Sequence, residues 1–308
     1  MSFSHLNPLD FNYLDYYSYL ERNNIQFKER VIKSLEEELG EICEGMCIGC
    51  VGSDARNENW GSKIELLFIN LCDDELSFEL IFNYILNSKI KEYLADAIEV
   101  KNRTTNDLFN SRLLIRGKKE SVIWSPYRTI DSLFLFGDFS ALEFIKTRFL
   151  EYGLSNKELI ERMKKRRNSH KKISETGEQR FKGEKLEHYN INEGFCIYDL
   201  DSHLWSFKQG PLRYVQYALS YRIISSKLKD LLYEPNTKKR IEFLNSIRII
   251  NKDYKDSLID TYLFFLHQYH ISQYEFYVNQ RKRIMFNPKL RREIEERLNQ
   301  LNNYITNI

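Results

Sequence analysis

The stretch that decides the fold lies between residues 46 and 69 and reads MCIGCVGSDARNENWGSKIELLFI. It holds two short apolar runs, residues 46–51 and 63–69, which are predicted to form buried strands because of their length and composition. Gly52 and Ser53 follow the first run directly. Because glycine has no side chain, this dipeptide permits a turn at which backbone N–H groups stay open to a phosphate. We therefore expect a strand, a Gly-Ser turn and a second strand.

The sequence on either side of this stretch is mostly helical in pattern. Residues 26–44 carry apolar side chains at steps of three and four, which predicts one amphipathic helix. Residues 73–93 also look helical, and DAIEV at 96–100 predicts a third, shorter strand. The polar, turn-rich segment 168–196 predicts a mobile loop. Further helices are predicted at 139–152, 156–167, 212–231, 238–250, 256–273 and 288–304.

Together these patterns predict an α+β protein with two domains. A chain of 308 residues is long enough for two domains of ordinary size. We expect a small mixed sheet within residues 1–137, followed by an all-helical domain at 138–308. The chain holds only 5 prolines and 12 glycines, which favours long helices.

Composition and charge narrow the class of protein. The net charge is +2, so no global field indicates nucleic acid or a membrane as partner. The basic run Lys164–Arg167, with Lys171 and Lys172, is predicted to be a solvated helix end. No apolar run approaches the roughly 20 residues of a spanning helix. The N-terminus lacks the features of a signal peptide, and the 5 cysteines are expected to be reduced, so we expect a cytoplasmic protein.

The charged residues of the second apolar run decide what chemistry the turn could support. Residues two positions apart on a strand share a face, so Lys63 and Glu65 are predicted to face the Gly-Ser turn together. In a site that transfers a nucleotidyl group both would be carboxylates, which chelate Mg²⁺ against a triphosphate. Glu99, on the predicted third strand, is the candidate for a third carboxylate. An ordinary βαβ turn with surface charges explains the same residues, so the pattern alone leaves both interpretations open.

The segment Gly52–Glu58 followed by Ser62–Glu65 is similar to the signature G-S-x-x-R-x-E…[ST]-D-x-D, except at Lys63. This signature marks protein-PII uridylyltransferases and related DNA-polymerase-β-like nucleotidyltransferases, and the chain resembles that family over about residues 30–300. Later segments resemble the family in the same order: Ile98–Val100 with Arg103-Thr104, Thr129–Leu133 with Phe136–Asp138, Ser206–Arg213, and the helix that begins near Phe264.

The resemblance implies a function. It implies transfer of a nucleoside monophosphate from a nucleoside triphosphate to a hydroxyl of a protein or small molecule, with Mg²⁺. The family's acceptor type is a tyrosine hydroxyl of a small signalling protein of the PII type. Full-length members carry hydrolase and sensor domains after this region, and this sequence holds no counterpart to them. By resemblance the nucleotide-binding residues are Gly52, Ser53, Arg56, Lys208 and Arg213, the metal ligands Glu65 and Glu99, and the catalytic residues Glu65, Glu99 and Lys63.

The departures from the family pattern leave two functions open. Lys63 replaces the first carboxylate of the D-x-D pair, Leu133 replaces an arginine, and Tyr214 replaces an acid after a loop without the paired glycines. A lysine at a metal site adds positive charge and removes a ligand, so Mg²⁺ affinity should fall. Either Lys63 contacts the triphosphate directly, or the chain is a catalytically inactive pseudo-nucleotidyltransferase that binds nucleotide or another protein.

Two other groups of residues have the spacing of metal ligands. Cys43, Cys47 and Cys50 match the spacing of an iron–sulfur ligand set. Two of them fall in a predicted buried strand, so we expect small buried hydrophobes instead. His267 and His270 lie three apart on a predicted helix, and such a pair can bind metal. No third ligand accompanies them, so core or surface histidines are the simpler interpretation.

Overall fold

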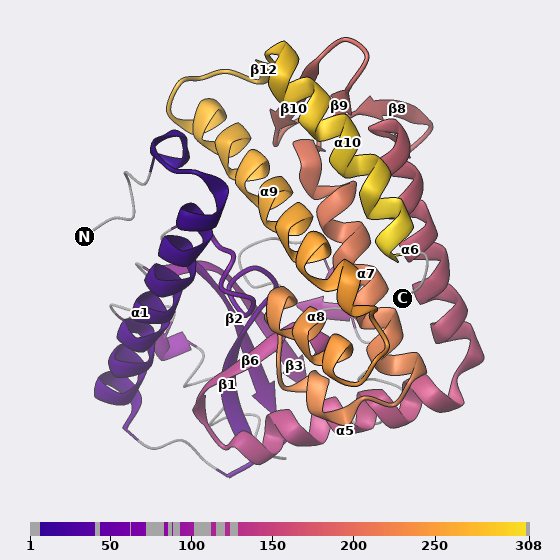
Figure 1. Ribbon diagram of the computed structural model, residues 1–308. Helices are drawn as coiled ribbons and strands as arrows, with labels where there is room; N and C mark the ends of the chain where they lie inside the picture. The colour runs from indigo at the N-terminus through magenta and orange to yellow at the C-terminus, as the bar shows by residue number, and fades with distance from the viewer. Residues whose placement is uncertain are drawn as a thin grey trace. The chain divides into compact units, whose positions relative to one another are not determined.

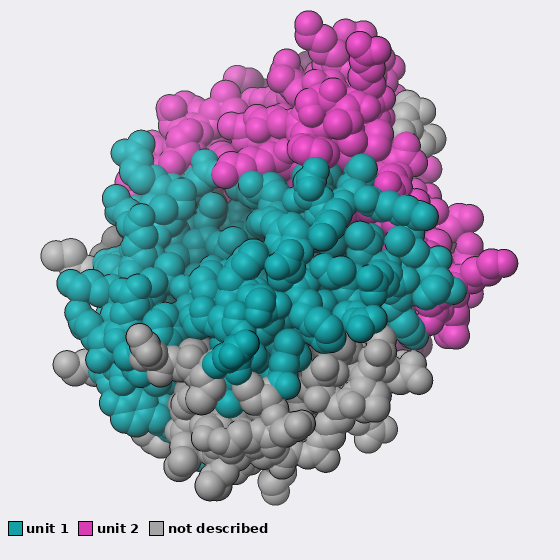
Figure 2. All heavy atoms as spheres, turned by 90° about the horizontal axis from the view of Figure 1, so that it is seen from below, with its two compact units in different colours: residues 1–4, 20–155, 227–236 teal, residues 5–19, 156–226, 237–308 magenta. Residues whose placement is uncertain are grey.

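The computed structural model describes residues 7–40, 44–61, 63–71, 83–85, 88, 93–101, 112–114, 121–123 and 129–305. The chain is a mixed α and β protein that divides into two compact units. Unit 1 comprises residues 1–4, 20–155 and 227–236, and unit 2 comprises 5–19, 156–226 and 237–308; Figure 2 shows them in teal and magenta. The predicted boundary at residue 137 differs from this division, because residues 138–155 belong to unit 1 and the chain returns to it at 227–236.

Unit 1 is built on a four-stranded sheet in the order β3-β2-β1-β6. Strand β1 pairs antiparallel with both β2 and β6, whereas β2 and β3 run parallel. The three strands predicted from the apolar runs are therefore confirmed. Two short strands, β4 and β5, form a separate antiparallel pair. The strands are β1 (Met46–Val51), β2 (Ile64–Asn70), β3 (Leu94–Lys101), β4 (Arg112–Leu114), β5 (Ser121–Ile123) and β6 (Ser132–Gly137).

Each face of this sheet has its own apolar cluster and its own helix (Figure 1). Helix α1 (Tyr13–Leu39) contributes Phe27, Val31 and Leu35 to one cluster, because these residues recur along one stripe of the helix. Helix α5 (Phe139–Ser155) contributes Ala141, Leu142 and Ile145 to the other. The helix predicted at 73–93 falls mostly outside the described residues.

Close packing of β1 against β6 requires a glycine in β1. A Cβ atom placed on Gly49 would lie 2.6 Å from the carbonyl oxygen of Leu133. The pairing of the two strands shifts register between Ile48 and Gly49, which marks a bulge. A larger residue here would push β6, and the turn that precedes it, away from β1.

Unit 2 holds most of the predicted helices, although α6 continues beyond its predicted end at residue 167. They are α6 (Lys157–Thr176), α7 (Pro211–Ser225), α8 (Thr237–Ser246), α9 (Lys252–Tyr277) and α10 (Pro288–Ile305), with short 3-10 turns η1 (Pro8–Asp10) and η3 (Ser206–Lys208). The predicted helix at 212–231 is α7 followed in unit 1 by the short turn η4 (Lys229–Leu232). Buried α9 side chains such as Leu258, Tyr262 and Phe265 supply much of the unit's core.

Two expectations for this region are wrong. The segment 168–196 is not a loop: α6 continues to Thr176 and leads into the hairpin of β7 (Glu178–Phe181) and β8 (Glu184–Glu187). The region is also not all helical, because β10 (Phe195–Asp199) pairs with β9 (Tyr189–Asn190), β11 (Leu204–Trp205) and β12 (Arg283–Met285). Among the described helices, none combines the length and apolar character that crossing a bilayer requires.

Candidate functional site

The Gly-Ser turn follows β1 in a tight, hydrogen-bonded conformation. Gly52 has φ +64°, a left-handed conformation that glycine adopts without strain. Its N–H donates to the carbonyl oxygen of Asp131 at 2.9 Å, and its own carbonyl accepts from the N–H of Arg56 at 3.1 Å. The N–H of Glu58 donates to the carbonyl of Ser53 at 2.8 Å. A Cβ atom built on Gly52 would meet no heavy atom within 4 Å, so the space beside the turn is open.

Asp54 ties this turn to the beginning of β2. Its Oδ2 accepts from the backbone N–H of Glu65 at 3.0 Å, and its Oδ1 accepts from Asn59 Nδ2 at 2.5 Å. Burial raises the pKa of the Asp54 carboxyl to about 7, although both hydrogen bonds favour the charged form. The turn and Glu65 are therefore held next to each other by a buried side chain.

The connection between the turn and β2 is organised by amide and ammonium groups. Asn59 Nδ2 also donates to the carbonyl of Lys63 at 2.7 Å, and its Oδ1 accepts from the N–H of Gly61 at 2.9 Å. The buried Lys28 of α1 donates to the carbonyl of Asp54 at 3.1 Å and to Asn57 Oδ1. Helix α1 thus contacts the turn through the charged side chain of Lys28 as well as packing its apolar stripe against the sheet.

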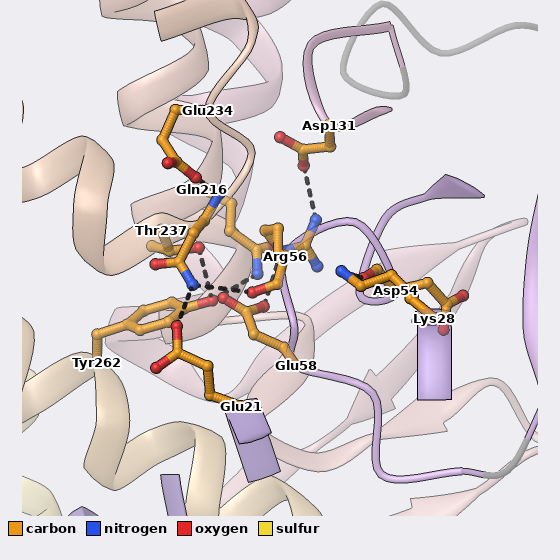
Figure 3. A network of polar contacts seen from close by, with 11 residues as sticks. Glu21, Lys28, Asp54, Arg56, Glu58, Asp131, Gln216, Glu234, Thr237 and Tyr262 are labelled. Atoms are coloured by element: carbon orange, nitrogen blue, oxygen red, sulfur yellow. Dashed lines mark hydrogen bonds and ion pairs between the residues drawn. The ribbon is translucent and has the colours of Figure 1, made fainter. Parts of the chain in front are cut away.

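Arg56 lies inside unit 1, between two carboxylates (Figure 3). Its Nε donates to Glu58 Oε2 at 2.7 Å and its Nη1 donates to Asp131 Oδ2 at 2.6 Å. Arg56, Glu58 and Asp131 are 7%, 3% and 5% exposed. The structure therefore gives Arg56 a role in holding the turn against the start of β6. Its predicted role in phosphate binding stays a prediction, and its guanidinium is buried and bonded to both acids.

A second segment of unit 1, residues 227–236, also bonds to the turn. Asn236, which is buried, donates through Nδ2 to the carbonyl of Arg56 and to Glu21 Oε1, both at 3.2 Å. The buried Lys146 of α5 donates to the carbonyl of Leu232 and, at 2.6 Å, to that of Ser132. Parts of the chain far apart in sequence therefore fix the turn's backbone.

The structure places Lys63 and Glu65 only partly as predicted. Lys63 is exposed and lies just before β2, and Glu65 is half-buried as its second residue. In the register of β2 and β3, Glu65 pairs with Asp96, whereas Glu99 lies opposite Phe68. Only the backbone of β3 is described, so Glu99 as metal ligand stays a prediction. The register adds Asp96 as a candidate that the sequence pattern had not indicated.

The predicted phosphate-binding residues of the Lys208 loop belong to unit 2. Lys208 is half-buried, with Nζ 5.4 Å from the centre of the Tyr269 ring. Arg213 donates through Nη1 to Gln209 Oε1 at 2.6 Å and lies 5.4 Å from the centre of the Trp205 ring. Whether these residues share a nucleotide with Gly52 and Ser53 stays a prediction.

The glycine and proline of this loop have a structural explanation. A Cβ atom on Gly210 would lie 2.6 Å from the hydroxyl of Tyr189, which donates to the carbonyls of Ile173 and Ser174. Pro211 opens α7, where a missing N–H costs nothing. This part of the family resemblance can therefore arise from packing alone.

The remaining candidate metal ligands have structural roles. Cys47 and Cys50 are buried in the clusters on opposite faces of the sheet, and burial raises the pKa of each thiol to about 12. Cys43 lies outside the described residues. His267 Nε2 bonds the carbonyl of Pro8 at 2.7 Å, and His270 Nδ1 bonds the hydroxyl of Tyr16 at 2.9 Å. Within the described part of the chain, no three metal-binding side chains gather as a metal site would require.

The site residues that sequence reasoning missed are the ones that hold the turn in place. Asn59, Asn236 and Lys28 bond its backbone or its neighbours. Only Asn59 lies near enough in sequence for its turn-forming amide to be noticed. No model of a known protein family matches this sequence, and no curated protein matches it.

Proposed function

We propose that the chain is a nucleotidyltransferase of the protein-PII uridylyltransferase type, with unit 1 as its nucleotide-binding part. The observation that carries this proposal is the hydrogen bond from the N–H of Glu65 to the side chain of Asp54. It places a turn with open space beside Gly52 next to the beginning of a strand that bears a carboxylate. A triphosphate needs such a neighbourhood, with space for its oxygens and a carboxylate for its cation. The N–H of Gly52 itself donates to Asp131, so the space beside the glycine and not its N–H supports the proposal.

In the proposed reaction an acceptor hydroxyl loses its proton to solvent and its oxygen bonds to the α-phosphorus. The bond from that phosphorus to the bridging oxygen breaks, and pyrophosphate leaves. Gly52 and Ser53 would orient the triphosphate, while Glu65 and an acid of β3 would hold Mg²⁺. When bound, Mg²⁺ neutralises charge on the phosphate oxygens. Two carboxylates would suit one ion better than the two ions of a full carboxylate set, and the exposed Lys63, just before β2, would add positive charge.

A second function is favoured by one observation. Lys63 is exposed just before β2, where the resemblance implies a metal ligand. An ammonium there repels a divalent cation but attracts phosphate. A pseudo-nucleotidyltransferase would bind nucleotide without transferring it, and would serve as a nucleotide-binding or protein-interaction module. A small signalling protein of the PII type is the proposed partner under either function.

The test is the Mg²⁺ dependence of nucleotide affinity. Affinity for each of four fluorescent nucleoside triphosphates is measured with and without Mg²⁺ for the wild type and for Lys63→Asp. We expect the wild type to depend weakly on Mg²⁺ and the variant to depend on it strongly, because an aspartate at position 63 restores a chelating pair with Glu65. Equal Mg²⁺ dependence in both proteins would remove Lys63 and Glu65 from the proposed site.

A matched pair of variants tests the third ligand. Asp96→Asn and Glu99→Gln each remove one negative charge from β3, at register positions opposite Glu65 and Phe68 respectively. We expect one of them, and not the other, to abolish the Mg²⁺-dependent binding of the Lys63→Asp protein. Incubation of the wild type with labelled nucleotide and a PII-type acceptor then separates the two functions, since only an enzyme labels the acceptor.

A further inference from the structure

The segment from α6 through the β7–β8 hairpin is far more basic than the chain as a whole. Residues 157–187 contain 11 lysines and arginines and 6 acids, whereas the whole chain has 46 and 44. Outside this segment acids therefore outnumber basic residues. Figure 1 shows β8 near one end of α6, and both lie in unit 2. The small net charge of the chain thus conceals a local concentration of positive charge.

Helix geometry keeps the basic side chains of α6 in solvent. The buried residues Leu159, Met163, His170 and Ile173 form one stripe of the helix, so Lys165 and Lys172 lie on another face. These two lysines are two turns apart and both are exposed. The predicted exposure of these two lysines to solvent is confirmed, but the predicted helix end is wrong, because α6 continues to Thr176.

Only some of these charges are neutralised by neighbours. Four ion pairs form within the segment: Arg162–Glu158, Lys164–Glu161, Lys171–Glu175 and Lys185–Glu178. In the described part of unit 2, Lys165, Lys172, Arg180 and Lys182 make no ion pair. We define these four residues as the basic patch. Their charge is thus available to an anionic partner.

Two residues of the basic patch, Lys172 and Arg180, line a groove between α6 and the hairpin. The groove has a volume of about 490 Å³ and its lining includes Lys172, Arg180 and Lys185 together with one acid, Glu178. Glu178 pairs with Lys185 at 2.6 Å, so Lys172 and Arg180 supply the unpaired positive charge of the groove. Arg180 and Lys185 are direct cross-strand partners. Like charges in that position repel, a cost that a bound phosphate would offset.

An exposed aromatic ring lies at the tip of the same hairpin. Phe181 is 40% exposed, and the two turn residues Lys182 and Gly183 have φ of +49° and +88°. Positive φ at both positions is typical of the tight hairpin turn, which presents the tip rigidly. The centre of the Phe181 ring lies 5.4 Å from the centre of the His203 ring and 5.5 Å from Lys182 Nζ. An aromatic ring and a positive charge therefore lie together at the tip.

We propose that the basic patch and Phe181 form a binding surface for single-stranded nucleic acid. Phosphates would contact the four basic side chains and the groove, and a base would stack on the Phe181 ring. Aromatic rings beside basic side chains suit this partner, because every base has a flat face and every linkage a charge. An acidic protein surface would use the charges but would leave the ring without a stacking partner. The proposal does not depend on nucleotide binding by unit 1.

The test measures binding of the full chain to a labelled single-stranded RNA of about 12 nucleotides, without nucleotide or Mg²⁺, across a range of NaCl concentrations. With three or four phosphates contacted, the plot of log affinity against log salt should have a slope of about −2 to −3. The double variant Lys172→Glu/Arg180→Glu should bind at least about tenfold more weakly, with a slope nearer zero. Phe181→Ala should weaken binding about five- to a hundredfold and leave the slope unchanged.

Lys289→Glu/Arg292→Glu is the matched control. Both residues are exposed in unit 2, and the double substitution changes the charge by the same amount. We expect its affinity to stay within about threefold of the wild type, because these residues lie outside the basic patch. Equal losses in both double variants, or no binding to RNA at low salt, would overturn the proposal. Binding to phosphatidylserine vesicles but not to RNA would overturn it in favour of a membrane surface.

Discussion

Removing the guanidinium of Arg56 should be among the most destabilising single changes in unit 1. Arg56→Met leaves Glu58 and Asp131 buried without the cation that now bonds both at 2.7 and 2.6 Å. Breaking a buried ion pair costs about 3–5 kcal/mol, because each remaining buried charge loses an ion-pair partner that solvent does not replace. A domain is stable by only about 5–15 kcal/mol, so the loss is a large fraction of the total. Arg56→Lys keeps the charge but cannot reach both acids in one fork, so we expect an intermediate loss.

The loss can be measured for unit 1 alone. Of the three tryptophans only Trp205 belongs to unit 2, so a Trp205→Phe background restricts fluorescence to unit 1. Urea unfolding in this background gives the free energy of unfolding for each variant. The matched control is Arg56→Met combined with Glu58→Gln and Asp131→Asn, which removes all three charges. It should recover most of the lost stability, because no unpaired charge is left behind. A loss below about 1 kcal/mol for Arg56→Met alone would refute the argument.

Three further predictions concern packing and titration. Burial, with Arg213 nearby, lowers the pKa of His188 to about 4 from 6.5, so its contribution to stability is complete above pH 6.5 and falls as pH falls towards 4. By pH 5 the loss should be about 2 kcal/mol, and urea unfolding of His188→Gln should show a smaller loss; equal pH profiles would contradict this. Gly210→Ala should lower the free energy of unfolding by about 1–3 kcal/mol through overpacking, whereas Gly61→Ala, with its nearest contact at 3.4 Å, should not. Anaerobically purified protein should be iron-free by metal analysis, and a cluster lost in Cys47→Ser would contradict the structural role of Cys47.

The two central strands of the unit 1 sheet could be predicted from sequence because they are short and apolar, whereas β6 was not predicted. Residues 46–51 and 64–70 form strands where the apolar runs lie. Most of the later helices were predictable for the same reason, since their apolar residues recur with the helical period. Local pattern was sufficient wherever burial of one face decides the structure.

The β7–β8 hairpin could not be predicted in this way. Its strands consist mostly of charged and polar residues and hold one apolar residue each, so they show no alternation of apolar and polar residues. The Lys182-Gly183 turn was the available signal, because a residue followed by glycine suits a tight hairpin turn. Helix α6 was cut short in the prediction because its last turns are dominated by polar residues, although His170 and Ile173 continue its buried stripe.

Contacts between residues far apart in sequence were the part of the candidate site that could not be predicted. The turn and Glu65 were predictable because they lie within one short stretch. The bond from Arg56 to Asp131 joins residues 75 positions apart, and that from Asn236 to Arg56 joins residues 180 apart. No spacing rule reports such pairs, so Arg56 could be matched to a motif but its partners could not be predicted.

The turn separates into two sets of residues with different consequences for function. Asp54, Arg56 and Glu58 are buried, Asp54 accepts from the N–H of Glu65, and Arg56 donates to Glu58, so the conformation of the turn depends on them. Gly52 and Ser53 are half-buried, with open space beside the glycine. The buried set explains why the segment resembles a nucleotidyltransferase signature even if no nucleotide is transferred.

Evidence for catalysis must therefore come from the residues that the fold does not require. Lys63 is exposed and contributes only its backbone carbonyl to the bonds that organise the connection, so an aspartate should fit there without cost to the fold. Arg56→Met, in contrast, should disturb nucleotide binding only through loss of stability. A Lys63→Asp protein that is as stable as the wild type, yet newly dependent on Mg²⁺, would attribute the change to the site itself. If stability and Mg²⁺ dependence change together, position 63 contributes to the stability of the fold, and Lys63 is removed from the proposed nucleotide-binding site.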